Sequence, residues 1–158
     1  MRLSEAVRGA LWESALGRRM GDKREEVETV ARTLLEAEDL VVVTSNEKKV
    51  KAVNEVLREF GMREARPADL PTDMADATPC PALFKAVMGV QATDADVVIA
   101  RGRLGVPGSG AMTVLMDSRC RVLTAALSPP HPLHGMDVEE AVRRELREAL
   151  SRVIRSKG

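Results

Sequence analysis

The first group of residues that could do chemistry lies where an apolar strand at 40–43 runs into a helix. Its polar side chains belong to Thr44, Ser45, Asn46, Lys48 and Lys49. A helix that begins here points unpaired backbone N–H groups and the positive end of its dipole at the turn, which suits a phosphate group. The two lysines would add countercharge. The same residues also fit a capping box between Thr44 and Glu47 with both lysines solvated, and spacing alone leaves both interpretations open.

A glycine-rich segment, ARGRLGVPGSG at 100–110, directly follows a second apolar strand. Glycines let the backbone approach a ligand closely, and successive N–H groups in such a loop can surround an anion. Two arginines alternate with Gly102 at the strand end, so both are expected to face one cleft and to favour a polyanion. The segment matches neither the P-loop nor the dinucleotide fingerprint, and a structural turn is the alternative. Its candidate ligand contacts are Arg101, Arg103, Gly108, Ser109 and Gly110.

An acidic loop precedes a predicted helix at 79–91 that presents Lys85. The loop carries Asp69, Asp73 and Asp76. Magnesium bound beside phosphates commonly takes only one or two protein carboxylates, which makes Asp73 and Asp76 candidate Mg²⁺ ligands. The alternative is a polar loop whose aspartates occupy turn and cap positions.

The segment SPPHPLHG holds the two histidines of the chain, His131 and His134. Metal-binding histidines usually have further ligands nearby, and this segment offers none. We therefore predict a proline-stiffened loop in which His131 lines a pocket.

Length and composition limit the classes of protein that can use these groups. The 158 residues, 44% of them hydrophobic, fit one globular domain. The 24 basic and 24 acidic side chains give a net charge of zero, and the only aromatic residues are one Trp and two Phe. These values argue against a nucleic-acid partner. Proteins that coat nucleic acid need positive charge to neutralise its phosphates, and proteins that bind single strands need aromatic side chains on which the bases stack. The sequence has no run of about 18 apolar residues, so we expect no membrane partner. We also expect a cytoplasmic protein.

Apolar spacing predicts the elements that position these groups. Only eight charged side chains lie in residues 77–136, so this centre is expected to hold buried strands and tight loops between helical flanks. Helices are predicted around 3–11, 27–34, 50–60, 79–91 and 138–154, and strands at 40–43, 96–100, 112–116 and 121–127. A hairpin is predicted at 117–120, and one further strand between the third and fourth helices. This order predicts a single α/β domain over 1–158, with three layers around a mixed sheet and residues 1–38 forming a helical pair packed on it.

Three segments in this order resemble the inosine-triphosphate pyrophosphatase fold. They are T-S-N-x-x-K from Thr44 to Lys49, D-L-P at 69–71 with the acids after it, and L-x-K-A at 83–86. Where those pyrophosphatases carry A-D-D-S-G-L, this chain has ARGRL at 100–104. The resemblance implies that fold and a phosphate site, with arginines in place of the acids that position water for hydrolysis.

A closer resemblance covers the whole sequence. The segments TSNEKKVKAVNEVL, ARGRLGVPGSG and MDSRCRVLTAALSPPHPLHG are similar to the guanylyltransferase family that helps to build the iron–guanylylpyridinol cofactor in methanogenic archaea. This resemblance implies a homodimer that joins GMP from GTP to the hydroxyl of a pyridinol and releases pyrophosphate. A nucleoside-triphosphate pyrophosphatase of the same fold and a non-catalytic nucleotide- or cofactor-binding protein are the alternatives.

On this hypothesis the candidate residues take three roles. Lys49, Lys85 and Arg101 are predicted to be catalytic, because phosphoryl-type transfer depends on positioning and charge neutralisation. Asp73 and Asp76 are predicted to hold Mg²⁺ as the cofactor. The predicted substrate-binding residues are Thr44, Ser45, Asn46, Lys48, Arg103, Gly108, Ser109, Gly110 and His131.

Overall fold

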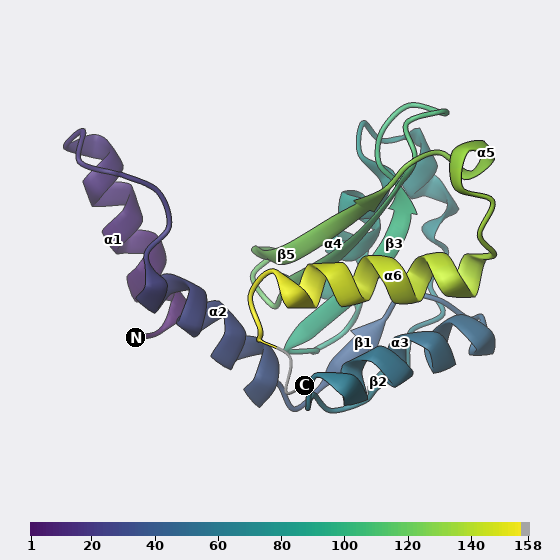
Figure 1. Ribbon diagram of the computed structural model, residues 1–158, viewed down its shortest axis with the longest axis horizontal. Helices are drawn as coiled ribbons and strands as arrows, with labels where there is room; N and C mark the ends of the chain where they lie inside the picture. Colours follow the sequence, from purple (N-terminus) through teal and green to yellow (C-terminus); the bar gives the residue numbers. More distant parts are fainter. Residues whose placement is uncertain (156–158) are drawn as a thin grey trace.

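The computed structural model describes residues 1–155 and shows five strands surrounded by helices (Figure 1). The helices are α1 (Leu3–Ala15), α2 (Arg24–Glu36), α3 (Glu47–Glu59), α4 (Pro81–Ala92), α5 (His131–His134) and α6 (Val138–Ser151), with the 3-10 helix η1 (Thr72–Ala77). The strands are β1 (Leu40–Val42), β2 (Ala65–Pro67), β3 (Val97–Arg103), β4 (Ala111–Asp117) and β5 (Val122–Ser128). Each helix and strand predicted from the apolar spacing is present, and η1 and α5 are additional.

The strands form one mixed sheet in the order β2-β1-β3-β4-β5. Strand β1 pairs in parallel with β2 and β3, and β4 pairs antiparallel with β3 and β5. The predicted hairpin joins β4 to β5, and the Asp117 carboxylate closes it by accepting hydrogen bonds from the N–H groups of Arg119 and Arg121, both at 2.9 Å. The predicted mixed α/β sheet is confirmed, while the likeness to the inosine-triphosphate pyrophosphatase fold stays a prediction.

Helices cover both faces of the sheet because side chains alternate in direction along each strand. Val98 and Ala100 of β3 belong to the core cluster that includes Ala86 of α4. Val97 and Ile99 of the same strand point the other way, into the larger cluster formed with α3 and α6. The molecule therefore has three layers, with α4 on one face and α3 and α6 on the other.

Residues 1–38 form a hairpin of α1 and α2 that extends away from the sheet at one end of the molecule (Figure 1). The second half of α2 is anchored by Leu34, which is fully buried in the larger core cluster, and Leu3 packs at the edge of that cluster. Helix α1 itself has no buried residue. Within residues 1–155, no helix combines the length and the apolar character needed to cross a membrane.

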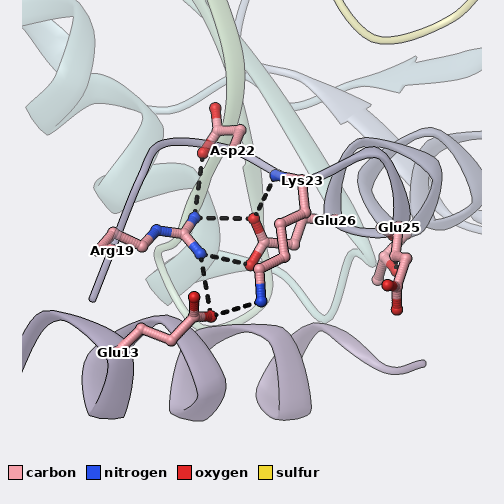
Figure 2. A network of polar contacts seen from close by, with 7 residues as sticks. Glu13, Arg19, Asp22, Lys23, Glu25 and Glu26 are labelled. Carbon is pink, nitrogen blue, oxygen red and sulfur yellow. Dashed lines mark hydrogen bonds and ion pairs between the residues drawn. The ribbon is translucent and has the colours of Figure 1, made fainter. Parts of the chain in front are cut away.

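An ion-pair network, here called the hairpin network, holds α1 against the turn that leads into α2 (Figure 2). Its members are Glu13, Arg19, Asp22, Lys23 and Glu26. Arg19 donates two hydrogen bonds of 2.8 Å to the Glu26 carboxylate, and Lys23 donates one of 2.9 Å to Glu13. The Arg19 guanidinium, together with the backbone N–H of Lys23, lowers the pKa of Glu26 to about 2. Charged side chains thus fix the orientation of α1.

Candidate active site

Three cavities meet at the carboxyl ends of β1 and β3, the edge where open α/β sheets commonly bind ligands. The innermost, here called the inner pocket, is lined by Thr44, Lys49, Lys85, Arg101 and Thr113 together with apolar residues. It shares Lys49 and Arg101 with a cavity of about 820 Å³ beside the glycine-rich loop, the glycine-side groove. It shares Thr44 and Lys85 with a cavity of about 550 Å³ beside the acidic loop, the acid-side groove. The sheet therefore gathers most of the predicted residues around one connected cleft.

The turn after β1 is organised by Asn46 rather than by Thr44. The Asn46 Oδ1 accepts hydrogen bonds from the backbone N–H groups of Lys48 (2.9 Å) and Lys49 (3.4 Å), while Thr44 Oγ1 accepts one from the Asn46 N–H (3.1 Å). The alternative of a capping box between Thr44 and Glu47 is therefore wrong, because Asn46 is the residue that directly precedes the helix and it is a strong cap in its own right. The N–H groups of Lys48 and Lys49 in the first turn of the helix are therefore already bonded within the chain.

The two adjacent lysines of α3 face different surroundings. Lys49 is half-buried and lines both the inner pocket and the glycine-side groove. Lys48 is exposed and lines none of the three cavities. Ser45, just before the helix, lines the acid-side groove. The segment thus directs Thr44, Ser45 and Lys49 at the cleft and turns Lys48 to solvent.

Arg101 is fixed by a buried glutamate that the sequence motifs did not indicate. Its Nε and Nη2 donate hydrogen bonds of 2.9 and 3.0 Å to the two carboxylate oxygens of Glu145, a fully buried residue of α6. The hydroxyl groups of Thr113 and Ser128 donate to the same carboxylate at 2.8 and 2.6 Å. A signal was available, because Glu145 follows Val142 by three residues and so lies within the apolar stripe of its helix, where an acid needs a partner.

Lys85 reaches the inner pocket from α4, on the other face of the sheet. Its Nζ donates a hydrogen bond of 3.1 Å to the backbone carbonyl of Arg101. Burial lowers the pKa of Lys85, the positive charge of Lys49 lowers it further, and the carboxylates of Asp76 and Asp73 act in the opposite direction. Three cationic side chains therefore line one pocket, an arrangement that favours a ligand with several negative charges.

Arg103 links the glycine-rich loop to η1 by hydrogen bonds, and its bound donors do not face a shared ligand site with those of Arg101. Its Nε donates to the carbonyl of Gly105 at 2.7 Å, and its Nη2 donates to the carbonyl of Asp76 at 2.9 Å. The Ser109 hydroxyl accepts a hydrogen bond of 2.9 Å from the Gly105 N–H, which closes the loop on itself. Both arginines line the glycine-side groove as predicted, but loop carbonyls already occupy the Nε and Nη2 donors of Arg103.

The two later glycines of the loop also line the glycine-side groove. Gly108 and Gly110 have φ angles of 100° and 89°, in the left-handed region that disfavours other residues. A Cβ atom at Gly110 would also collide with the backbone carbonyl of Ser128. The tight return of the chain into β4 therefore requires glycine there whether or not a ligand is bound.

His131 lines the glycine-side groove, as predicted, together with His134. The predicted loop is wrong in form, because residues His131–His134 make the one-turn helix α5, whose first turn accommodates Pro132 without loss of a helical hydrogen bond. The two imidazole rings meet edge to face with centroids 5.2 Å apart, and His134 Nδ1 accepts a hydrogen bond of 3.0 Å from the Met136 N–H.

A comparison with known protein families assigns the chain to a class of enzymes. The model of the family described as FeGP cofactor biosynthesis protein HcgB, guanylyltransferase, matches residues 3–154, nearly the whole chain. The chain belongs to the HcgB family. The resemblance found in the sequence is thereby confirmed, and the protein is a nucleotidyltransferase, a guanylyltransferase of FeGP cofactor biosynthesis.

The aspartates of the acidic loop in this HcgB-family chain make two different kinds of contact. Asp69 and Asp73 line the acid-side groove, whereas Asp76 uses its backbone carbonyl to hold Arg103. No three His, Cys, Asp or Glu side chains of residues 1–155 gather into a group that could hold a metal ion. A magnesium ion shared with substrate phosphates needs only one or two carboxylates, so Asp73 and Asp76 stay predicted ligands.

Proposed function

We propose that the chain joins GMP from GTP to the hydroxyl group of a pyridinol and releases pyrophosphate. The observation that carries this proposal is the inner pocket, where Lys49, Lys85 and Arg101 line the junction of two grooves. Such a junction suits a reaction that must hold two substrates beside one phosphorus atom. Membership of the HcgB family supports guanylyl transfer, and the identity of the acceptor is part of the proposal.

The reaction is a displacement at the α-phosphorus of GTP. The pyridinol oxygen forms a new bond to that phosphorus, and the bond from the phosphorus to the oxygen that bridges to the β-phosphate breaks. Pyrophosphate leaves with the bonding electron pair, and negative charge builds on it. Lys49, Lys85 and Arg101 offset that charge. A ring hydroxyl is more acidic than an alkyl alcohol, so solvent can accept its proton without a dedicated base.

Magnesium fits the same cleft. Asp73 lines the acid-side groove, and the carboxylates of Asp73 and Asp76 both act electrostatically on Lys85, which supports their proposed role as hard oxygen ligands near the inner pocket. When bound, Mg²⁺ supplies additional positive charge to the phosphate oxygens. Asp73→Asn and Asp76→Asn, made separately, should raise the magnesium concentration needed for half-maximal rate in at least one variant. An unchanged magnesium requirement in both would remove the two aspartates from the metal site.

We also propose that the enzyme is a homodimer that uses the α1–α2 hairpin as its contact. Val7, Leu11 and Trp12 of α1 and Leu16 directly after it are each more than half exposed. Several exposed apolar side chains on a projecting helix are unusual on a free surface, and a second copy could cover them symmetrically. Sedimentation velocity should show a dimer for the wild type and a monomer for Leu11→Glu. A dimer that survives this substitution would place the contact elsewhere, and a monomeric wild type would refute the dimer.

Pyrophosphate release in the presence and absence of the acceptor tests the proposed reaction. The enzyme is incubated with GTP and Mg²⁺, with or without a pyridinol, and pyrophosphate is measured over time. Guanylyl transfer predicts release that depends on the pyridinol. Release at the same rate without acceptor would favour a nucleoside-triphosphate pyrophosphatase, and binding of GTP without any release would favour a non-catalytic binding protein.

A further inference from the structure

Four hydrogen bonds converge on the Glu145 carboxylate inside the protein. Oε1 accepts from Arg101 Nε and from the Thr113 hydroxyl, and Oε2 accepts from Arg101 Nη2 and from the Ser128 hydroxyl. Glu145 has no exposed surface, and Thr113 and Ser128 are also buried. Because the donors come from β3, β4 and β5 and the acceptor from α6, this Glu145 cluster joins three strands to the helix that covers them.

One edge of the Arg101 guanidinium does not contact Glu145. The Nε and Nη2 atoms bind Glu145, whereas Nη1 has no hydrogen-bond acceptor among residues 1–155. A quarter of the side chain is exposed, and the residue lines both the inner pocket and the glycine-side groove. A guanidinium held by two parallel hydrogen bonds keeps a fixed plane, so its remaining donors point in a defined direction.

Stability alone gives little reason for a carboxylate at this position. A buried ion pair often contributes no more to stability than well-packed apolar residues of similar volume, because both charges lose their hydration. The neighbouring residues of α6, Val142 and Leu146, are apolar and almost completely buried. Glu145 interrupts this apolar stripe of α6 at the position where Arg101 of the inner pocket contacts the helix.

We propose that Glu145 is a positioning residue, which fixes Arg101 so that Nη1 donates to a phosphate oxygen of the nucleotide in the inner pocket. The inference rests on the proposed guanylyl transfer. Lys85 belongs to the same arrangement, because its Nζ is bound to the backbone carbonyl of Arg101. Glu145 acts through the arginine and does not touch the substrate.

A double-mutant cycle separates positioning from a general effect on folding. Arg101→Ala and Glu145→Gln should each lower kcat/KM by about 100-fold, since a displaced or missing donor in a preorganised site has roughly this effect. The double variant should lose no more than about threefold beyond Arg101→Ala, because coupled groups are strongly non-additive. Losses that multiply in the double variant would show that Glu145 acts independently of Arg101 and would overturn the proposal.

A second bidentate pair on α6 supplies the matched control. Arg147 donates two hydrogen bonds of 2.9 Å to Glu59 of α3, and both side chains are close to half exposed. Arg147→Ala and Glu59→Gln should leave kcat/KM at the wild-type value. An equal loss of kcat/KM in this pair and in the Glu145 cluster would mean that breaking any such pair on α6 disables the enzyme.

Chemical rescue gives a result that a purely structural role would not produce. Guanidinium added at millimolar concentration should restore part of the activity of Arg101→Ala, because the Glu145 carboxylate can hold the free cation in place. It should fail in the double variant with Glu145→Gln. If Glu145→Gln does not fold, Ser128→Ala removes one of the four hydrogen bonds and should give a smaller loss that disappears in the Arg101→Ala background. Additive losses there would overturn the proposal.

Binding of inorganic pyrophosphate distinguishes failure of this inference from failure of the proposed reaction. Calorimetry on the wild type, Arg101→Ala and Glu145→Gln requires no turnover. A wild type that makes no guanylylpyridinol but binds pyrophosphate, with equal weakening in both variants, would refute the reaction and support the role of Glu145. Wild-type affinity in Glu145→Gln together with weak binding in Arg101→Ala would refute the role of Glu145 whatever the reaction.

Discussion

The hairpin network and the inner pocket are both clusters of charged side chains, but their charges are balanced differently. The hairpin network sets two cations against three carboxylates, and its members bind one another directly (Figure 2). Around the inner pocket and its loop, a single carboxylate, that of Glu145, accepts hydrogen bonds from the cationic side chains within residues 1–155. Those cations are Lys49, Lys85, Arg101 and Arg103.

This difference indicates that the hairpin network stabilises the fold, whereas the cations of the inner pocket are available to bind a ligand. Charges that satisfy one another, as Arg19 and Glu26 do, need nothing from outside the chain. Cations without matching acids suit a polyanionic substrate, because binding it supplies the missing countercharge. A chain whose net charge is zero can therefore present an inner pocket lined by three cationic side chains, Lys49, Lys85 and Arg101, and by no carboxylate within residues 1–155.

Removing one arginine from each cluster should give the largest contrast. Arg101→Ala should lower kcat/KM about 100-fold, as expected for the loss of a preorganised donor at the developing charge. Arg19→Ala, made in the hairpin network, should leave kcat/KM per correctly assembled enzyme close to the wild-type value. Steady-state kinetics on both variants tests the contrast, and similar losses would show that the two clusters are not functionally distinct.

The two adjacent lysines of α3 allow a residue that lines the cleft to be compared with one that faces solvent. Lys49→Ala should raise the KM for GTP about tenfold or more, since a hydrogen bond to a charged group contributes about 1.5–3 kcal/mol. Lys48→Ala should leave KM unchanged, because Lys48 faces solvent. Initial rates measured over a range of GTP concentrations give the KM of each variant and test this prediction. If the two substitutions have equal effects, the helix orientation deduced for α3 does not describe the bound state.

The sequence predicted the elements well because apolar spacing is a local property. It also predicted Lys49, Lys85 and Arg101 as candidate catalytic residues, and the structure brings all three to the inner pocket, because each follows or lies in an element that the spacing defines. Glu145 could not be assigned to Arg101 in this way, because the pair is separated by 44 residues and depends on how α6 lies across β3. The acceptors of Arg103 are backbone carbonyls, which no pattern of side chains reveals.

The pKa of Lys85 predicts a pH effect on the cleft. Burial lowers this pKa, and the charge of Lys49 lowers it further, so Lys85 loses its proton at a lower pH than an ordinary lysine. GTP affinity should therefore fall as the pH rises toward 10.5, and Lys85→Arg should move this fall to higher pH, because arginine stays charged. The KM for GTP, measured across alkaline pH, tests it; identical profiles for both proteins would exclude Lys85 as the titrating group.

The same burial has the opposite consequence for stability. Below the folded-state pKa of Lys85 the buried charge disfavours the folded state. This penalty is relieved as the pH rises from the folded-state pKa toward 10.5.

The smallest effect is expected from acid titration of the hairpin network. The pKa of Glu26 is lowered from 4.5 to about 2, so its contribution to stability is present above pH 4.5 and is lost as the pH falls toward 2. The protection factors of the α1 and α2 amides against hydrogen exchange, which correct for the intrinsic pH dependence of exchange, should therefore fall across this window in the wild type. In Glu26→Gln the protection factors should be lower already at neutral pH and should change less with acid. Equal pH profiles would show that the network does not hold the hairpin.

The proposed reaction joins two molecules through one phosphate group beside the cationic side chains of the inner pocket. The most direct measurement is a mass spectrum of the products after incubation with GTP, Mg²⁺ and a pyridinol. Guanylyl transfer predicts a product with the mass of the pyridinol plus GMP minus water, with one pyrophosphate formed for each product molecule. GMP and pyrophosphate without the joined product, or unchanged GTP at full occupancy of both substrates, would contradict it.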